Sequence, residues 1–324
     1  MNVAAVYPAV CLSAVLASAA SVPFWRRWCR RTGVMDDPGQ RKIHSDPIPL
    51  AGGMAVMTGL LAPLLAGTAV AFAFPHFKVA GLFEHGLSVR AVQILSLVTG
   101  ALGMLWIGLR DDTSDLRPAA KFGGQLAVAL LVASAGKRIT LFVPSPLFSY
   151  GITVLWILTV VNAVNFMDNM NGLCAGLGAI GAAWFGLIAA RQGQYLVGTM
   201  SFLAAGALLG FLPFNFPRAS AFLGDAGSHL TGYLLAVLAI LPHFYTAKHP
   251  RPLAVLTPLL VLAVPLADMA WVVLLRWRKG QPFYVGDTNH LSHRLVRGGL
   301  SPVRAVVLIW LLAAAAGALA FVLQ

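Results

Sequence analysis

Long apolar stretches are the feature that most constrains how this chain can fold. A helix needs about 20 largely apolar residues to cross the hydrocarbon core of a bilayer. Ten stretches near that length follow one another along the 324 residues, at 4–24, 51–74, 91–109, 119–135, 148–166, 172–191, 195–214, 227–246, 253–276 and 303–322. The pattern predicts an all-α, polytopic integral membrane protein with about ten transmembrane helices.

The composition agrees with this prediction and excludes other classes. Only 10% of the residues are charged, against about 25% in a soluble domain, and a disordered chain would need low hydrophobicity. No basic residue precedes Arg26, so the first stretch is expected to be an uncleaved helix and not a signal peptide. Without internal repeats or linkers, residues 1–324 are expected to form a single integral-membrane domain.

The distribution of charge predicts an orientation. Lysine and arginine concentrate in cytoplasmic loops, and 16 of the 23 basic residues fall on one side of the ten-span arrangement if the N-terminus is outside. Both termini are therefore expected outside. Nine of the eleven acids face the cytoplasm in the same arrangement, whereas Asp268 lies within the ninth stretch and Glu84 lies outside.

Acids and bases gathered on one membrane face suit a site for a metal ion and phosphate. Carboxylates bind Mg²⁺, and lysine and arginine bind phosphate oxygens. Simple solvation of loops would scatter the acids over both faces. The net charge of +12 suits anionic lipid headgroups or an anionic substrate, and no nucleic acid is expected because the chain has no soluble basic domain.

Two cytoplasmic loops carry candidate phosphate ligands. In the loop 36–53, three prolines exclude a helix, and Lys42 and His44 could meet phosphate, although a basic loop flanking the membrane explains this segment alone better. After the third stretch come Asp111 and Asp112, adjacent carboxylates that repel each other unless a cation neutralises them. Solvated pairs of this kind are common, but Lys121 follows near the same surface.

The strongest local anomaly is the segment NAVNFMDNMNG at 162–172. Four asparagines and an aspartate at the end of an apolar helix are costly unless they have partners, and a helix cap explains only one of them. Asn165 lies on one face with Asn162 and Asn169, and Asp168 can point into the same site. Here a functional site is the better explanation.

Two further loops complete the cytoplasmic set. Asp225 precedes the eighth stretch, where it could cap a helix or form part of a phosphate-binding turn with the glycines around it. In the last loop His290 and His293 lie three residues apart, on one helix face. A zinc pair lacks a third ligand at the usual spacing, so we expect the histidines and arginines of this loop to bind a sugar or a diphosphate.

Taken together and in this order, the motifs resemble the polyprenyl-phosphate N-acetylhexosamine-1-phosphate transferases, glycosyl transferase family 4. The matching segments are RKIHSDPIPLAGG, GLRDD followed by KFGGQ, NAVNFMDNMNGL, FNFPRASAFLGDAGS and HLSHRL. VPLADM at 264–269 and KGQPF at 279–283 look more like the branch that uses UDP-N-acetylglucosamine. The resemblance implies an enzyme of the bacterial inner membrane, with its active site facing the cytoplasm.

The family's reaction, by this resemblance, is transfer of an N-acetylhexosamine 1-phosphate from a UDP-sugar to undecaprenyl phosphate, with Mg²⁺ or in its place Mn²⁺ as cofactor and UMP as product. Such a product starts a lipid-linked cell-envelope glycan. The oligomeric state stays open, with a homodimer as one alternative. The residues implied in catalysis are Asp111, Asp112, Asp168 and His290. Those implied in binding substrate are Lys42, His44, Lys121, Asn171, Asn215, Phe222, His293 and Arg294. Among these, the resemblance implies that Phe222 stacks on uracil, with Asn171 and Asn215 nearby. Those implied in binding the metal are Asp225, Asn165 and Asp112.

Two departures from the family pattern concern the same sites. Asn171 stands where most bacterial members have a second aspartate, which excludes an acid–base role for it, and Ser292 replaces a histidine of HxHHRL. The phospho-N-acetylmuramoyl-pentapeptide transferases are an alternative branch, but they usually carry three consecutive histidines here. A membrane transporter or lipid flippase is the alternative from another class. It would place acids at midplane beside broken helices, and only Asp268, near Pro265, fits that pattern.

Overall fold

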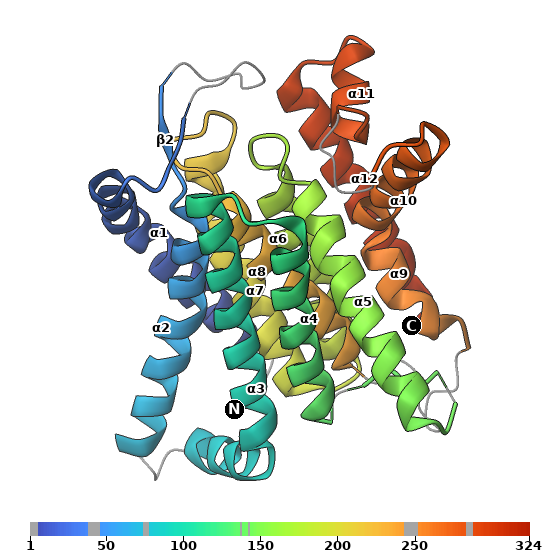
Figure 1. The fold of residues 1–324 in the computed structure, drawn as a ribbon. Coiled ribbons are helices and arrows are strands. Elements are labelled where there is room, and N and C mark those ends of the chain that lie inside the picture. The colour runs from blue at the N-terminus through green and yellow to red at the C-terminus, as the bar shows by residue number, and fades with distance from the viewer. Residues whose placement is uncertain are drawn as a thin grey trace.

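The computed structural model describes residues 6–37, 46–73, 78–136, 138–141, 143–242, 252–282 and 288–324. The chain is helical apart from a short antiparallel pairing of β1 (Met35–Asp36) with β2 (Ile48–Pro49) (Figure 1). The helices are α1 (Val6–Thr32), α2 (Gly52–Ala73), α3 (Lys78–Ser114), α4 (Pro118–Ser134), α5 (Pro146–Phe166), α6 (Leu173–Arg191), α7 (Tyr195–Asn215), α8 (Gly224–Ile240), the 3-10 helix η2 (Pro252–Leu256), α9 (Thr257–Val261), α10 (Ala263–Arg278), α11 (Leu291–Arg297) and α12 (Pro302–Val322).

Each of the ten apolar stretches coincides with a helix or with a pair of helices. Within the described residues, seven helices are long and apolar enough to cross a membrane, and the bent pair Leu253–Val261 and Ala263–Arg278 would make eight. The helix α4 is apolar but has only 17 residues. The prediction of an all-helical, polytopic membrane protein is confirmed. The number of ten spans and the orientation stay predictions.

Proline marks both the beginnings and the bend of these helices. Proline occupies the first turn of α4, α5 and α12, where its missing N–H would have no partner in any case. Ser145 and Ser301 cap two of these helices by accepting backbone N–H groups. At the junction of α9 and α10 the axis bends by 71°, and Pro265 has no N–H to donate to the carbonyl of Val261.

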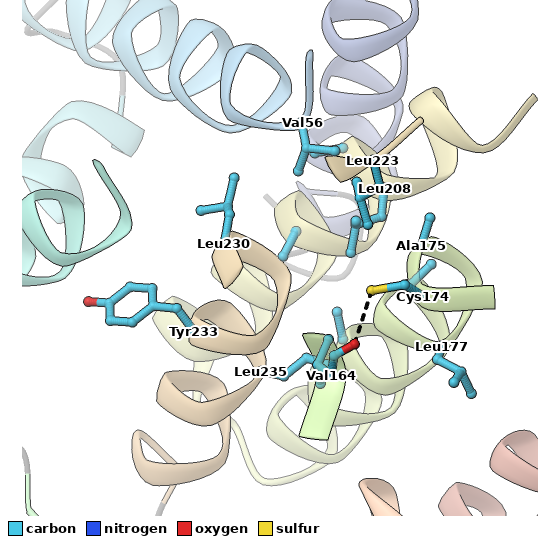
Figure 2. Packing of buried hydrophobic residues seen from close by; sticks show 14 of the residues in the cluster. Val56, Val164, Cys174, Ala175, Leu177, Leu208, Leu223, Leu230, Tyr233 and Leu235 are labelled. Atoms are coloured by element: carbon cyan, nitrogen blue, oxygen red, sulfur yellow. Dashed lines mark hydrogen bonds between the residues drawn. The ribbon is translucent and has the colours of Figure 1, made fainter. Parts of the chain in front are cut away.

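Apolar side chains from neighbouring helices form the buried core of the bundle, and Figure 2 shows part of it. The part drawn includes residues of α2, α5, α6, α7 and α8, among them the fully buried Leu208, Leu230 and Tyr233. The close packing of α7 on α1 depends on glycine, because a Cβ at Gly206 would lie 2.3 Å from the carbonyl oxygen of Cys11. Small residues at such crossings are typical of membrane helices.

Four helices converge where the candidate acids lie. α3 packs against α4 and α8, and α5 also packs against α4 and α8. The segment after β2 is tied to the loop before α8, since Gly52 N–H donates to the Phe222 carbonyl at 2.9 Å and Phe222 N–H donates to the Pro49 carbonyl at 2.9 Å. The end of the first loop, at Pro49 to Gly52, is therefore joined to the loop before α8 at this end of the bundle.

Candidate active site

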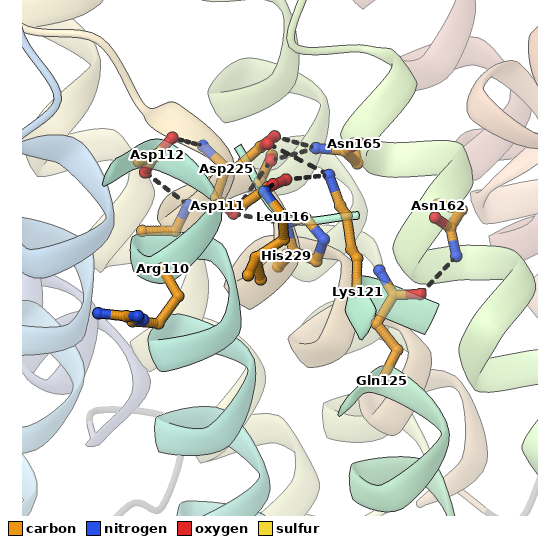
Figure 3. Close-up of polar contacts among 12 residues, drawn as sticks. Arg110, Asp111, Asp112, Leu116, Lys121, Gln125, Asn162, Asn165, Asp225 and His229 are labelled. Carbon is orange, nitrogen blue, oxygen red and sulfur yellow. Dashed lines mark hydrogen bonds and ion pairs between the residues drawn. The ribbon is translucent and has the colours of Figure 1, made fainter. Parts of the chain in front are cut away.

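Lys121 links two carboxylates that lie far apart in the sequence (Figure 3). Its Nζ is 2.6 Å from Oδ2 of Asp111 and 3.1 Å from Oδ2 of Asp225. Asp111 comes from the end of α3, Lys121 from the first turn of α4 and Asp225 from the first turn of α8. The packing of these three helices thus brings together two of the predicted acids and the predicted phosphate-binding lysine.

Asp112 holds the N-terminus of α8. Its Oδ1 accepts a hydrogen bond from the backbone N–H of Asp225 at 2.7 Å, and its Oδ2 accepts one from Ala226 at 3.0 Å. A carboxylate at a helix N-terminus satisfies free amides and interacts favourably with the helix dipole. Asp112 therefore fixes the position of the Asp225 backbone, from which the Asp225 side chain extends.

Asn165 connects α5 to the same cluster. Its Nδ2 donates to Oδ1 of Asp225 at 2.6 Å and to Oγ of Ser228 at 2.8 Å. The Oδ1 atom of Asn165 itself can therefore act as an acceptor. The neighbouring Asn162 instead donates to Oε1 of Gln125 at 2.9 Å. Ser228 belongs to this cluster but was missed in the sequence, because a serine inside an apolar helix carries no distinguishing local signal.

Asp168 lies in the turn between α5 and α6. Burial raises the pKa of its carboxyl well above the usual value, and the negative charges of Asp225 and Asp112 raise it further. Like charges close together disfavour ionisation of a carboxyl group. Asp168 is therefore close enough to the Asp112–Asp225 cluster to interact with it electrostatically.

The residues predicted near a uracil hold two loops together. Asn215, 3% exposed, accepts from Gly172 N–H at 2.8 Å and donates to the Ala221 carbonyl at 3.0 Å. Asn171 donates to the Pro217 carbonyl at 3.3 Å. Phe222 is partly buried against the apolar core. The structure places all three at the joined loops after α5 and α7, and their contact with a base stays a prediction.

The last loop lies against the end of α5 through His290. Its Nδ1 is 2.7 Å from Oδ2 of Asp268, and its ring meets that of Phe166 edge to face at 5.6 Å. Arg294 lies over the ring of Trp271 at 4.8 Å, and the rings of His293 and His290 are 6.4 Å apart. No local pattern around Asp268 indicated that it has this partner. Lys42 and His44 lie outside the described residues.

The oxygen donors around Lys121 suit a hard cation. Mg²⁺ binds protein through one or two carboxylates and takes its other ligands from water and substrate phosphates. Among the described residues no three His, Cys, Asp or Glu side chains form a ready-made metal cage. Two carboxylates nevertheless converge on one cation, the Lys121 ammonium, with the Asn165 amide beside them. This donor set fits a magnesium ion whose coordination is completed by substrate.

The cluster of carboxylates and a lysine lies at the ends of helices of an apolar, membrane-type bundle. The model of glycosyl transferase family 4 matches residues 94–243, which contain all members of this cluster. A decaprenyl-phosphate N-acetylglucosaminephosphotransferase of Mycolicibacterium smegmatis is 33% identical over 326 residues, covering 91% of this chain and 78% of the relative.

Two other relatives show the same breadth of similarity. A probable undecaprenyl-phosphate N-acetylglucosaminyl 1-phosphate transferase of Bacillus subtilis strain 168 is 30% identical over 298 residues, with 90% of this chain and 77% of the relative covered. An undecaprenyl-phosphate alpha-N-acetylglucosaminyl 1-phosphate transferase of Escherichia coli K12 is 29% identical over 306 residues, with 90% and 77% covered. The chain belongs to glycosyl transferase family 4 and is a phosphoglycosyl transferase.

Proposed function

We propose that this enzyme transfers N-acetylglucosamine 1-phosphate from UDP-N-acetylglucosamine to undecaprenyl phosphate, releases UMP and so starts a lipid-linked cell-envelope glycan. The observation that carries the proposal is the convergence of Asp111 and Asp225 on Lys121 at the ends of apolar helices. A soluble nucleotide sugar and a lipid phosphate can meet only at such a boundary. The names of the relatives support N-acetylglucosamine as the sugar.

Mg²⁺ is the proposed cofactor, with Mn²⁺ as a substitute. Asp225, Asn165 and Asp112 are the proposed metal-binding residues, with Asp111 beside them. When bound, the ion supplies positive charge to the phosphate oxygens of the substrates. Phosphoryl transfer depends mainly on positioning and on neutralising charge, so few other groups are needed.

The protein's own residues supply the rest of the proposed mechanism. The ammonium of Lys121 neutralises a substrate phosphate, and the N-terminus of α8, fixed by Asp112, directs its positive dipole end to the same place. Asp168 supplies a carboxyl group at the edge of the cluster. His290, His293 and Arg294 bind the diphosphate or the sugar from the other side of the turn after α5.

The proposed location is the bacterial inner membrane, with the site at the cytoplasmic face. The excess of basic residues in the loops on that side supports this orientation. Asp268, the acid that favoured a transporter, has both its oxygens bonded to the start of α11. The alternative of a membrane transporter, which needs an acid at midplane, therefore loses the residue that supported it.

A direct assay tests the proposal. Purified protein is incubated with undecaprenyl phosphate, Mg²⁺ and a panel of UDP-sugars that includes UDP-N-acetylmuramoyl-pentapeptide, and UMP is measured. We expect UMP from UDP-N-acetylglucosamine, and none from the same protein carrying Asp225→Asn. Release with the pentapeptide substrate alone would assign the chain to the other branch, and no release with any donor would overturn the proposal.

A further inference from the structure

Asp268 is a buried carboxylate inside the apolar helix α10, with 4% of its surface exposed. Its Oδ2 lies 2.7 Å from Nδ1 of His290, and its Oδ1 accepts a hydrogen bond from the Leu291 backbone N–H at 2.6 Å. An acid within a membrane helix is costly unless it has partners. Both oxygens of Asp268 bond to residues at the start of α11, so this acid anchors that helix.

The ring that Asp268 holds is packed against the end of α5. His290, 6% exposed, meets Phe166 edge to face at 5.6 Å. The guanidinium of Arg276 lies over the Phe166 ring, 5.1 Å from its centre. Phe166 directly follows Asn165, which bonds to Asp225, so the His290 ring contacts the residue next to a member of the proposed metal-binding cluster.

A second contact fixes α11 on the same turn. Ser292 Oγ donates to Oδ1 of Asn169 at 2.6 Å, and Asn169 Nδ2 donates to the Phe166 carbonyl at 2.6 Å. The start of α11 is thus held by α10 through Asp268 and by the turn after α5 through Asn169. Such bonds from two elements leave the His290 ring little freedom.

We propose that Asp268 is the positioning residue of His290: it accepts a hydrogen bond from Nδ1–H and directs Nε2–H of the imidazolium to the diphosphate of the nucleotide sugar. The inference rests on the proposed function. A hydrogen bond at one ring nitrogen fixes the orientation of the ring and therefore which nitrogen meets the substrate. The surrounding charge suits an anion, since His293, Arg294 and Arg276 are basic and both oxygens of Asp268 are already bonded.

The kinetic test uses Asp268→Asn, which keeps the shape of the side chain but has one acceptor oxygen in place of two. We expect kcat for UMP release to fall about 10- to 100-fold, the size of effect seen when the partner that orients a metal-bound histidine is lost. We expect the KM for UDP-N-acetylglucosamine to rise as well, because the ring contacts its diphosphate. The Mg²⁺ concentration for half-maximal rate should stay close to wild type. Asp268→Glu, which keeps the carboxylate, should recover part of the rate. Asp115→Asn, in an exposed loop acid, is the matched control and should behave as wild type.

A double-mutant cycle shows whether Asp268 acts through His290. In a His290→Ala background, Asp268→Asn should change kcat less than about twofold, because the group it positions is absent. An equal fall in both backgrounds would overturn the inference. An unchanged kcat in Asp268→Asn, with wild-type protein releasing UMP, would overturn it while leaving the proposed function standing.

The ring itself gives a measurement that does not depend on activity. In protein labelled with ¹⁵N at its eight histidines, the His290 signals are identified by their loss in His290→Ala. We expect Asp268→Asn to shift these ring signals and leave those of the other histidines in place. An unmoved His290 signal would overturn the inference. If wild-type protein releases no UMP but the His290 signals shift, the contact stands and the proposed function fails.

Discussion

Replacing Lys121 with methionine removes the cation that the described structure places between Asp111 and Asp225. The ammonium lies 2.6 and 3.1 Å from the two carboxylates, and the three side chains are 21%, 11% and 32% exposed. Removing one partner of a fully buried ion pair costs about 3–5 kcal/mol, because the remaining charge stays buried without compensation. Partial exposure to solvent screens that charge, so we expect a loss of about 2–3 kcal/mol in the free energy of unfolding.

Thermal unfolding of purified protein in EDTA and in Mg²⁺ measures this effect. In EDTA, Lys121→Met should melt several degrees below wild type, and Lys279→Met, which alters an exposed lysine at the end of α10, should melt with wild type. Mg²⁺ should raise the melting temperature of Lys121→Met more than that of wild type, because the ion neutralises the same carboxylates. UMP release should still be low, since the substrate phosphate has lost its lysine. Equal melting in EDTA, or an equal rise with Mg²⁺, would refute this reasoning.

Three other substitutions test separate parts of the site. Asp112→Asn leaves one amide at the start of α8 without an acceptor, which costs about 1–3 kcal/mol in the free energy of unfolding. The substitution should abolish UMP release, while membrane fractionation should show that the protein still inserts. Asp168→Asn should stabilise the protein in EDTA, more at pH 8 than at pH 5. Because the pKa of Asp168 is raised in the folded protein, its ionisation lowers stability as the pH rises from the pKa of the unfolded state toward that of the folded state. Melting temperatures at the two pH values measure the difference. Gly172→Ala should lower the melting temperature, because φ is 75° and the new Cβ would lie 2.6 Å from Cβ of Phe216.

The helices could be predicted from the sequence because their signal is local. An apolar stretch long enough to cross a bilayer is visible residue by residue, and every stretch from 4–24 to 303–322 coincides with a helix or a bent pair. The same local signal found the polar segment 162–172, since asparagines in an apolar helix need partners wherever they lie.

The pairing within the site could not be predicted, because it depends on how the helices pack. The sequence indicated a repelling pair at Asp111 and Asp112, but it could not show that one carboxylate turns to Lys121 and the other to the start of α8. Asn215 was expected near a uracil, and its amide joins Gly172 to Ala221. The partner of Asp268 could not be recognised in the sequence, because His290 comes 22 positions later, beyond the end of the helix.

Tracing the β-phosphate of the donor tests the central claim most directly. UDP-N-acetylglucosamine labelled at that phosphate is incubated with the purified enzyme, undecaprenyl phosphate and Mg²⁺, and the lipid and the released nucleotide are separated. A sugar 1-phosphate transfer predicts that the label moves to the lipid in step with UMP release, and that Asp225→Asn abolishes both. Label recovered in released UDP would instead show transfer of the sugar alone, and this would contradict the account.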